Sequence, residues 1–306
     1  MEDFAGKLAV VTGGGSGMGR ELVRQLAAQG CSVAACDWDA AAVAETMAMA
    51  QAGAPDDVRL SGHVCDVSDE PQVQGFRDEL LREHAADHVD LVFSNAGIGG
   101  GASFINSSRE EWEQTFAVDW WGTYYCARTF LPLLIASGDG VLVNTSSVNG
   151  FWASLGPRMP NSAYATAKFA VKGFTEALIE DLRTNAPQVR VALVMPGHVG
   201  TDILANTRRA HGTPEPEGRN AARIEAAFRD RARLSAAAAA TIILDGVRSG
   251  AWRILVGEDA KVLDAVVRAR PEAAYDYAKL AMLAAKEAVE DRAGNWLSAI
   301  RSLFPS

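Results

Sequence analysis

Thr12-Gly13-Gly14-Gly15-Ser16-Gly17-Met18-Gly19 follows directly on the apolar run Leu8-Ala9-Val10-Val11. A short apolar run of this kind predicts a buried strand, and the spacing of apolar residues after Gly17 predicts a helix. The glycines permit a tight turn and let a ligand approach the backbone, while the amides at a helix N-terminus attract anions. The stretch therefore predicts a strand–turn–helix unit that cradles the phosphates of a nucleotide. The alternative is a flexible glycine turn, and the strand before it and the helix after it argue against that alternative.

Similar apolar runs and helical patterns alternate along most of the chain. Strands are expected at Leu8–Thr12, Ser32–Cys36, Val58–Cys65, Asp90–Ser94, Gly140–Ser146, Arg190–Met195 and Trp252–Val256. Helices are expected at Gly17–Ala28, Ala40–Gln51, Glu70–Glu83 and Glu110–Phe130. Near-continuous apolar strands are typical of a parallel sheet covered on both faces. The alternation predicts an α/β fold with a doubly wound parallel sheet, whose ligands bind at the carboxyl edge of the strands.

No linker divides the chain, so we expect a single domain over residues 1–257 and a helical C-terminal extension over 258–306. The segment Thr207–Asn220 is rich in Gly, Pro and charge, and it predicts a mobile loop or lid within residues 203–235. Pro271 breaks the helical pattern of the extension in two. The extension is expected to pack on the domain or on a partner subunit.

The composition argues against several classes of protein. A formal net charge of −9 disfavours binding to nucleic acid or to an anionic membrane, because both require a basic surface. No apolar run approaches the roughly 18 residues of a membrane span, and no signal peptide is expected. The four cysteines form no CxxC pair, so buried free thiols in a reducing compartment are expected, and the protein is predicted to be cytoplasmic. We expect no bound metal.

The second expected strand ends in Cys36-Asp37, about 20 residues after the glycines. An acidic residue at this place can accept hydrogen bonds from both hydroxyls of a cofactor's ribose, and its charge repels the additional phosphate of NADP. Neither Ser16 nor Trp38 offers a cation for that phosphate. The sequence therefore favours NAD as the cofactor. Asp39 is an alternative to Asp37 in this role, and a solvated aspartate at the start of a loop is the other alternative.

Tyr164 and Lys168 lie four positions apart in a helical pattern, which places them on the same face of the helix. A nearby ammonium favours the phenolate, so Lys168 is expected to lower the pKa of Tyr164 from its usual value near 10. Tyr164 would then act as a general acid or base at moderate pH. Such a pair alone is commonplace, but the strand that ends in Asn144-Thr145-Ser146-Ser147 adds hydroxyls at the same ligand edge.

Together these motifs resemble the short-chain dehydrogenase/reductase family over about residues 5–257. The matching segments are Thr12–Gly19, Asp66-Val67, Asn95-Ala96-Gly97, Asn144–Ser147, Tyr164–Lys168 and Pro196–Thr201. Their glycine spacing and the Tyr-xxx-Lys pair are similar to the single-domain branch of that family. The resemblance implies a Rossmann-like fold and an NAD-dependent oxidoreductase that interconverts a secondary alcohol and a ketone.

The resemblance also implies the roles of the catalytic residues. Tyr164 would exchange the proton with the substrate oxygen, and Lys168 would lower its pKa and bind the nicotinamide ribose. Ser147 would hold the substrate oxygen, with Ser146 as the alternative if the match is shifted by one position. Asp119 stands where the family usually has an asparagine that acts through its backbone, holding a water in a proton relay to the lysine. An aspartate could keep that backbone role.

For the cofactor, the resemblance assigns the adenine amino group to Asp66, beside the backbone of Val67. Asn95-Ala96-Gly97 would line the adenosine ribose and support the sheet, and Val199 and Thr201 would bind the nicotinamide amide. The complete set of expected cofactor-binding residues is Gly13, Ser16, Gly17, Met18, Gly19, Asp37, Asp66, Val67, Asn95, Ala96, Gly97, Tyr164, Lys168, Pro196, Val199 and Thr201.

Ser147 and Tyr164 are 17 positions apart, a longer separation than the family usually shows, so a loop insertion is expected within Phe151–Ser162 at the mouth of the substrate site. The apolar side chains expected there, which suggest a medium-sized hydrophobic substrate, are Phe151, Trp152, Leu155, Met159 and Leu204. Packing in the core or at a subunit contact is the alternative for some of them.

The resemblance further implies a homo-oligomer, a tetramer or a dimer, formed through the helices 110–130 and 164–183 and the last strand. Alternative functions are a non-catalytic dinucleotide-binding sensor or scaffold, an NADP-dependent carbonyl reductase, and a lyase or isomerase that uses the same tyrosine. The presence of Ser147, Tyr164 and Lys168 together argues against the sensor.

Overall fold

A computed structural model describes residues 3–99, 103–154, 161–212 and 219–276, with the side chains of 219–224 excepted. Its central sheet has seven parallel strands in the order β3-β2-β1-β4-β5-β6-β9. The strands are β1 Leu8–Thr12, β2 Ser32–Asp37, β3 Leu60–Val64, β4 Leu91–Ser94, β5 Gly140–Thr145, β6 Val189–Pro196 and β9 Arg253–Val256. A second sheet pairs β7 (Val199–Gly200) with β8 (Leu234–Ser235). The strand order reverses between β1 and β4, and ligands of such sheets bind at this switch point.

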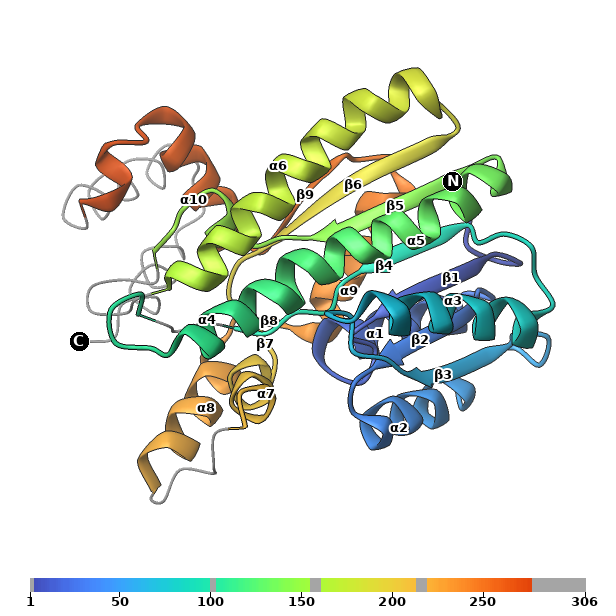
Figure 1. Cartoon of the computed structure of the whole chain (residues 1–306), viewed down its shortest axis with the longest axis horizontal. Coiled ribbons are helices and arrows are strands. Elements are labelled where there is room, and N and C mark those ends of the chain that lie inside the picture. The colour runs from blue at the N-terminus through green and yellow to red at the C-terminus, as the bar shows by residue number, and fades with distance from the viewer. Residues whose placement is uncertain (1–2, 100–102, 155–160, 213–218, 277–306) are drawn as a thin grey trace.

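Helices cover both faces of the sheet (Figure 1). They are α1 Gly17–Ala28, α2 Ala40–Gln51, α3 Glu70–His84, α4 Arg109–Phe116, α5 Gly122–Ser137, α6 Ser162–Asn185, α7 Ile203–Ala210, α8 Arg219–Arg231, α9 Ala236–Arg248 and α10 Glu258–Ala269. One apolar core lies between the sheet and α1, α2 and α9, and the other lies between the sheet and α3, α5 and α6. This is the predicted Rossmann-like, doubly wound architecture.

Alternate residues of each strand enter opposite cores. Val11 of β1 packs in the core with Leu22 and Ile243, whereas its neighbour Val10 packs with Phe130 on the other side. Every residue of β1 is therefore buried. This explains why the strands appear in the sequence as continuous apolar runs without polar alternation.

The predicted helix 110–130 is interrupted, which the sequence did not reveal. A π-helical turn, η1 (Ala117–Trp121), separates α4 from α5, and it contains the buried Asp119. A π-helix accommodates an additional residue per turn, and such turns occur mostly at functional sites. Apolar side chains continue on both sides of η1, so their spacing alone does not show the change in hydrogen bonding.

The described part of the C-terminal extension packs against the segment that follows Ser147. α10 and the short helix η3 (Ala273–Tyr275) bury Leu263 and Ala274 against Trp152, which is 2% exposed. The Trp152 indole donates a hydrogen bond to the Ala274 carbonyl over 2.8 Å. The expectation that Trp152 lines a substrate pocket is therefore wrong, because its ring serves as the anchor of the extension. Leu155, Met159 and the rest of the expected loop at 155–160, like the extension beyond residue 276, lie outside the described residues.

All four cysteines are buried and free, as predicted. Within the described ranges, no helix is both long and apolar enough to cross a membrane.

Trp152→Ala should lower the free energy of unfolding by about 3–5 kcal/mol, because it leaves a cavity under the extension. Urea unfolding followed by circular dichroism measures this change. Trp252→Ala is the matched control, since Trp252 is 46% exposed and its loss should change stability by about 0.5 kcal/mol or less. Equal effects of the two substitutions would contradict the assignment of Trp152 as an anchor.

Candidate active site

The glycine loop has the tight geometry that its sequence predicts. Gly13 and Gly17 have φ of 65° and 52°, a left-handed conformation that strongly favours glycine. A Cβ atom on Gly13 would lie 2.8 Å from Ala96 Cα, and one on Gly19 would lie 2.0 Å from the Gly13 carbonyl oxygen. Helix α1 begins at Gly17, and Ser16 makes no side-chain capping bond to it. The first amides of α1 are thus left for an anion.

The two acidic residues after β2 have different partners. Asp37 is buried at the end of β2, where its carboxylate accepts hydrogen bonds from the amides of Gly15 (2.9 Å) and Asp39 (3.1 Å). Burial raises the pKa of Asp37, and these two bonds oppose that rise. Asp39 instead caps α2 by accepting a hydrogen bond from the Ala42 amide over 3.0 Å. Asp37 is the carboxylate at the strand end, as the sequence predicted.

The hydroxyl of Thr12 joins the two strands at the switch point. It accepts hydrogen bonds from the amides of Asn95 and Ala96, each over 3.1 Å. The Asn95 side chain returns a hydrogen bond to the Thr12 carbonyl over 3.2 Å. Asn95 Oδ1 is buried and has no hydrogen-bond partner among the described residues. Asn95 therefore supports the sheet while keeping an acceptor free beside the pocket.

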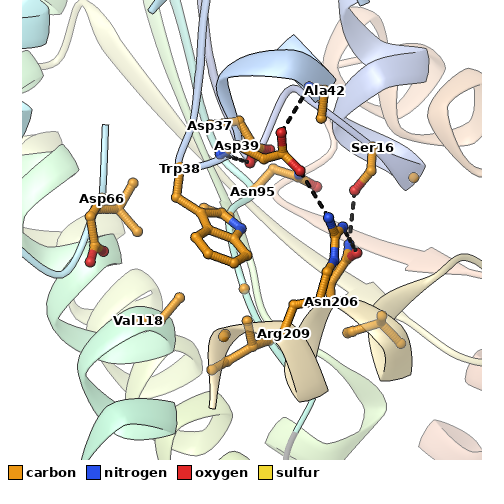
Figure 2. Close-up of a pocket in the computed structure, with 18 of the residues that line it drawn as sticks. Ser16, Asp37, Trp38, Asp39, Ala42, Asp66, Asn95, Val118, Asn206 and Arg209 are labelled. Atoms are coloured by element: carbon orange, nitrogen blue, oxygen red, sulfur yellow. Dashed lines mark hydrogen bonds and ion pairs between the residues drawn. The ribbon is translucent and has the colours of Figure 1, made fainter. Parts of the chain in front are cut away.

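A pocket opens between these loops (Figure 2). The expected cofactor residues that line it are Gly13, Ser16, Gly17, Met18, Asp37, Asp66, Val67, Asn95, Ala96, Gly97 and Thr201. The remaining expected residues, which do not belong to its described lining, are Gly19, Tyr164, Lys168, Pro196 and Val199. A glycine cradle, a helix N-terminus and a buried carboxylate at the strand end fit the diphosphate and the ribose of a dinucleotide.

Tyr164, Lys168 and Ser147 meet close to Gly97, a residue of the pocket lining. The Lys168 ammonium lies 5.4 Å from the centre of the Tyr164 ring and donates a hydrogen bond to the Thr145 carbonyl over 3.2 Å. The Ser147 hydroxyl lies near enough to the Tyr164 phenol to lower the pKa of that phenol. The Ser146 hydroxyl instead donates to the Lys168 carbonyl over 2.8 Å. Of the two serines, Ser147 is thus the one beside the phenol.

Asp119 pairs directly with Lys168, which the sequence did not predict. Its Oδ1 lies 3.2 Å from the Lys168 ammonium and accepts a hydrogen bond from the Ile98 amide, also over 3.2 Å. Asp119 is fully buried, and this burial raises its pKa to about 6 despite the neighbouring ammonium. The resemblance implied a role through the backbone, whereas the structure brings the side chain itself to the lysine.

The pKa of Tyr164 is raised, so the expectation of a lowered value is wrong. Burial is the main cause, and the negative charge of Asp119 adds to it. The Lys168 charge and the hydrogen bond with Ser147 act in the expected direction but do not outweigh these effects. The sequence pattern contained the ammonium but not the carboxylate that offsets it.

Three further residues reach the site from distant segments. Asp259, at the start of α10, accepts a hydrogen bond from the His198 amide over 2.6 Å and so holds the loop after β6. Asn206 and Arg209 of α7 line the pocket. Arg209 places a positive charge beside Asp39, where the neighbouring residues in the sequence offered none. The adjacent arginines in the expected lid were the only signal, and no motif spacing connects position 209 to position 39.

The chain belongs to the short-chain dehydrogenase family, whose family model matches residues 7–212. It is 36% identical over 271 residues to SadH of Mycobacterium tuberculosis, named as an oxidoreductase, covering 88% of this chain and 92% of that protein. It is 32% identical over 201 residues to the (3R)-3-hydroxyacyl-CoA dehydrogenase of Mus musculus, covering 64% of this chain and 75% of that one.

A solved structure of a Burkholderia phymatum short-chain dehydrogenase/reductase in complex with NAD is similar as well. The two chains superimpose with a TM-score of 0.75 at 31% identity, covering 89% of this chain and 95% of the other. The protein is therefore an oxidoreductase of a family that binds a nicotinamide dinucleotide.

Gly97→Ala should disrupt the buried pair. A Cβ atom on Gly97 would lie 2.6 Å from Asp119 Oδ1 and 3.2 Å from the Lys168 ammonium. We expect a loss of turnover of about tenfold or more, because small displacements of catalytic groups can cost up to about 100-fold. Steady-state kinetics on the folded variant measure the loss.

Gly75→Ala in α3 is the matched control, because nothing lies within 4 Å of its added Cβ. It should keep full turnover. Its stability should rise by up to about 1 kcal/mol, because alanine lowers the conformational entropy of the unfolded chain. If Gly97→Ala behaved like this control, the space beside Asp119 and Lys168 would not matter for catalysis.

Proposed function

We propose that this oxidoreductase is an NAD-dependent dehydrogenase that interconverts a secondary alcohol and a ketone. The observation that carries the proposal is the cluster of Ser147, Tyr164 and Lys168 at the carboxyl edge of the sheet. A phenol, a hydroxyl and an ammonium at this edge suit proton exchange with an oxygen atom next to a bound dinucleotide.

The chain's own residues would hold the cofactor and handle the proton. When bound, NAD would provide the nicotinamide ring that accepts the hydride. Tyr164 takes the hydroxyl proton of the alcohol or returns it to the ketone, and Ser147 holds the oxygen in place by a hydrogen bond. Lys168 stabilises the phenolate by its charge. Asp119 fixes the position of that charge, since their atoms lie 3.2 Å apart in a fully buried setting.

Cofactor binding is proposed for the residues that the sequence named. The amides of the glycine loop and of the first turn of α1 would hold the diphosphate. Asp37 would accept hydrogen bonds from the ribose hydroxyls and repel the phosphate of NADP. Arg209 is the observation that favours the second candidate, an NADP-dependent carbonyl reductase. Its charge, however, is already paired with Asp39 over 2.8 Å, so we retain NAD.

The substrate is proposed to be a medium-sized hydrophobic alcohol or ketone. Support comes from Leu204 on α7, which is half-buried and follows the pocket residue Ile203, whereas Phe151 and Trp152 pack toward the extension. We also propose a cytoplasmic homo-oligomer, a tetramer or a dimer, formed through α5 and α6. Exposed apolar side chains, Trp121 at the end of η1 next to α5 and Phe169 on α6, support this interface.

Tyr164→Phe tests the chemistry. We expect wild-type protein to reduce NAD, and NADP far less, with a panel of hydrophobic secondary alcohols, followed at the reduced-nicotinamide absorbance band. The variant should lose about 10²- to 10⁴-fold in kcat, the usual contribution of a general acid or base, while it still binds NADH. Equal rates in the two proteins, or a preference for NADP, would refute the proposal.

Asp119→Asn should move the pH profile of alcohol oxidation to lower pH. Oxidation requires the Tyr164 phenolate, so kcat/KM rises with pH through the Tyr164 pKa. The negative charge of Asp119 disfavours the phenolate, and its removal lowers that pKa. Measurement of kcat/KM against pH locates the rising limb in each protein.

The control for this experiment is Glu176→Gln, which removes a partly exposed carboxylate from α6 that pairs with Lys172. Its charge is screened by solvent, so the rising limb should stay in place. A limb that is unmoved in folded Asp119→Asn, or moved to higher pH, would show that Asp119 does not act on Tyr164.

A further inference from the structure

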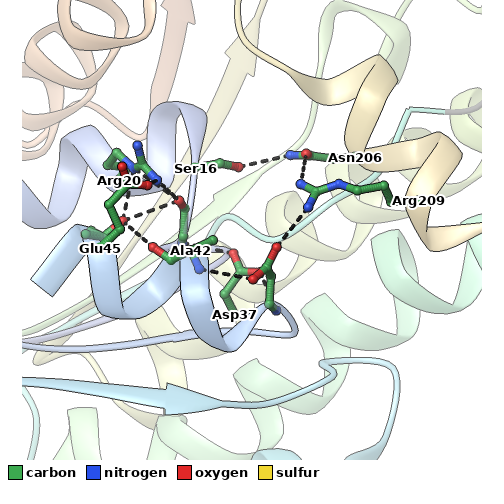
Figure 3. Close-up of polar contacts among 10 residues, drawn as sticks. Ser16, Arg20, Asp37, Ala42, Glu45, Asn206 and Arg209 are labelled. Carbon is green, nitrogen blue, oxygen red and sulfur yellow. Dashed lines mark hydrogen bonds and ion pairs between the residues drawn. The ribbon is translucent and has the colours of Figure 1, made fainter. Parts of the chain in front are cut away.

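Side chains of helix α7 contact two loops that line the cofactor pocket, the glycine loop and the loop after β2 (Figure 3). The Asn206 side chain donates a hydrogen bond to the Ser16 hydroxyl of the glycine loop over 3.0 Å. The Arg209 guanidinium donates to Asp39, at the start of α2, over 2.8 Å and to the Asn206 side chain over 2.7 Å. The polar contacts therefore run from Ser16 through Asn206 and Arg209 to Asp39 without a break.

The two sides of α7 have different partners. Ile203, Asn206, Arg209 and Ala210 line the pocket, and their spacing of three or four positions places them on one helix face. Arg208 points elsewhere and pairs with Glu225 of α8 over 2.9 Å. No residue of α7, all of which are described, is buried. Because no residue of α7 is fully buried, polar contacts contribute to holding it in place, both with the cofactor loops and with α4, where the Gln114 side chain donates a hydrogen bond to the Ala210 carbonyl over 2.8 Å.

Trp38 is a further contact of Arg209 in the lining of the pocket. Its exposed indole lines the pocket, and the Arg209 guanidinium carbon lies 5.9 Å from the ring centre, within the range of a cation–π contact. Figure 2 shows Arg209 reaching from α7 toward Asp39 on the loop that carries Trp38. Asp39 is a fixed anchor for it, since the Ala42 amide holds the same carboxylate.

We propose that Asn206 and Arg209 are cofactor-retaining residues, which fasten α7 over the adenosine half of the bound dinucleotide through Ser16 and Asp39. This inference rests on the proposed NAD-dependent function. NAD enters and NADH leaves when these contacts open, so their strength sets the rate of cofactor release. These contacts act on the adenosine half of the cofactor. ADP-ribose, which has that half but lacks the nicotinamide, is therefore retained in the same way.

The test is the rate of NADH release, measured by stopped-flow displacement and detected by energy transfer from tryptophan. Arg209→Ala should speed release about fivefold, the upper range for an exposed ion pair. The side chains of Arg209 and Asp39 are 46% and 25% exposed, so salt should speed release from wild type but not from this variant. Arg209→Lys, which keeps the charge, should restore much of the retention and the salt dependence.

A double-mutant cycle with Asp39→Asn tests whether Arg209 acts through Asp39. Asparagine caps helices as well as aspartate does, so α2 keeps its start while the ion pair is lost. The double variant should release NADH no faster than either single variant. The affinity for ADP-ribose should fall by the same factor as that for NADH in each case.

Arg208→Ala is the matched control, because it removes an arginine of the same helix that pairs away from the pocket. It should leave the release rate within about twofold of wild type, as expected for a surface substitution. Equal acceleration by Arg208→Ala and Arg209→Ala, additive effects in the cycle, or unchanged release from Arg209→Ala would overturn the inference. If wild-type protein did not bind NADH at all, the proposed function would fail and the inference with it.

Discussion

The buried charge of Lys168 is the constraint around which the active site is arranged. Its side chain is 3% exposed, and an ammonium without partners in such a place would cost several kcal/mol. Three separate elements provide the compensation: the end of β5 through the Thr145 carbonyl, η1 through Asp119, and α6 through the ring of Tyr164. The glycine at position 97 leaves the room that this arrangement requires. The sheet edge, the π-turn and α6 are therefore fixed relative to one another by one charge.

The two carboxylate oxygens of Asp119 are not equally hydrogen-bonded, and the charge of Asp119 in turn affects the pKa of Tyr164. Asp119 Oδ1 has two hydrogen-bond donors, whereas its Oδ2 is buried without a partner among the described residues. Burial raises the pKa of Asp119 to about 6, because the Lys168 charge and the Ile98 amide oppose this rise without outweighing it. The same carboxylate opposes the effect of Lys168 on Tyr164. A tyrosine next to a lysine thus does not by itself imply an acidic phenol.

Local patterns predicted the sheet, most helices and the glycine loop because the physics of those features is local. Helices α1 and α2 begin and end at the predicted residues, since apolar spacing and the flanking turns define them. The same patterns could not predict that Trp152 anchors the extension, that Asp119 turns its side chain to Lys168, or that Arg209 meets Asp39. Each of these contacts joins segments far apart in the chain, and tertiary packing alone decides it. Where a motif named a position, as for Ser147 and Asp37, the choice between neighbouring candidates still required the direction of a side chain.

Two segments from the second half of the chain close the site, and they are attached by different forces. The extension buries Leu263 and Ala274 against Trp152 and holds the loop after β6 through Asp259, so it can leave only by exposing apolar surface to water. No residue of helix α7 is fully buried, and its contact with Asp39 joins two partly exposed side chains. Contacts of that kind open at little cost in free energy. The extension is therefore held by apolar packing beside the segment that follows Ser147, whereas α7 is the segment whose polar contacts we propose to open for cofactor release.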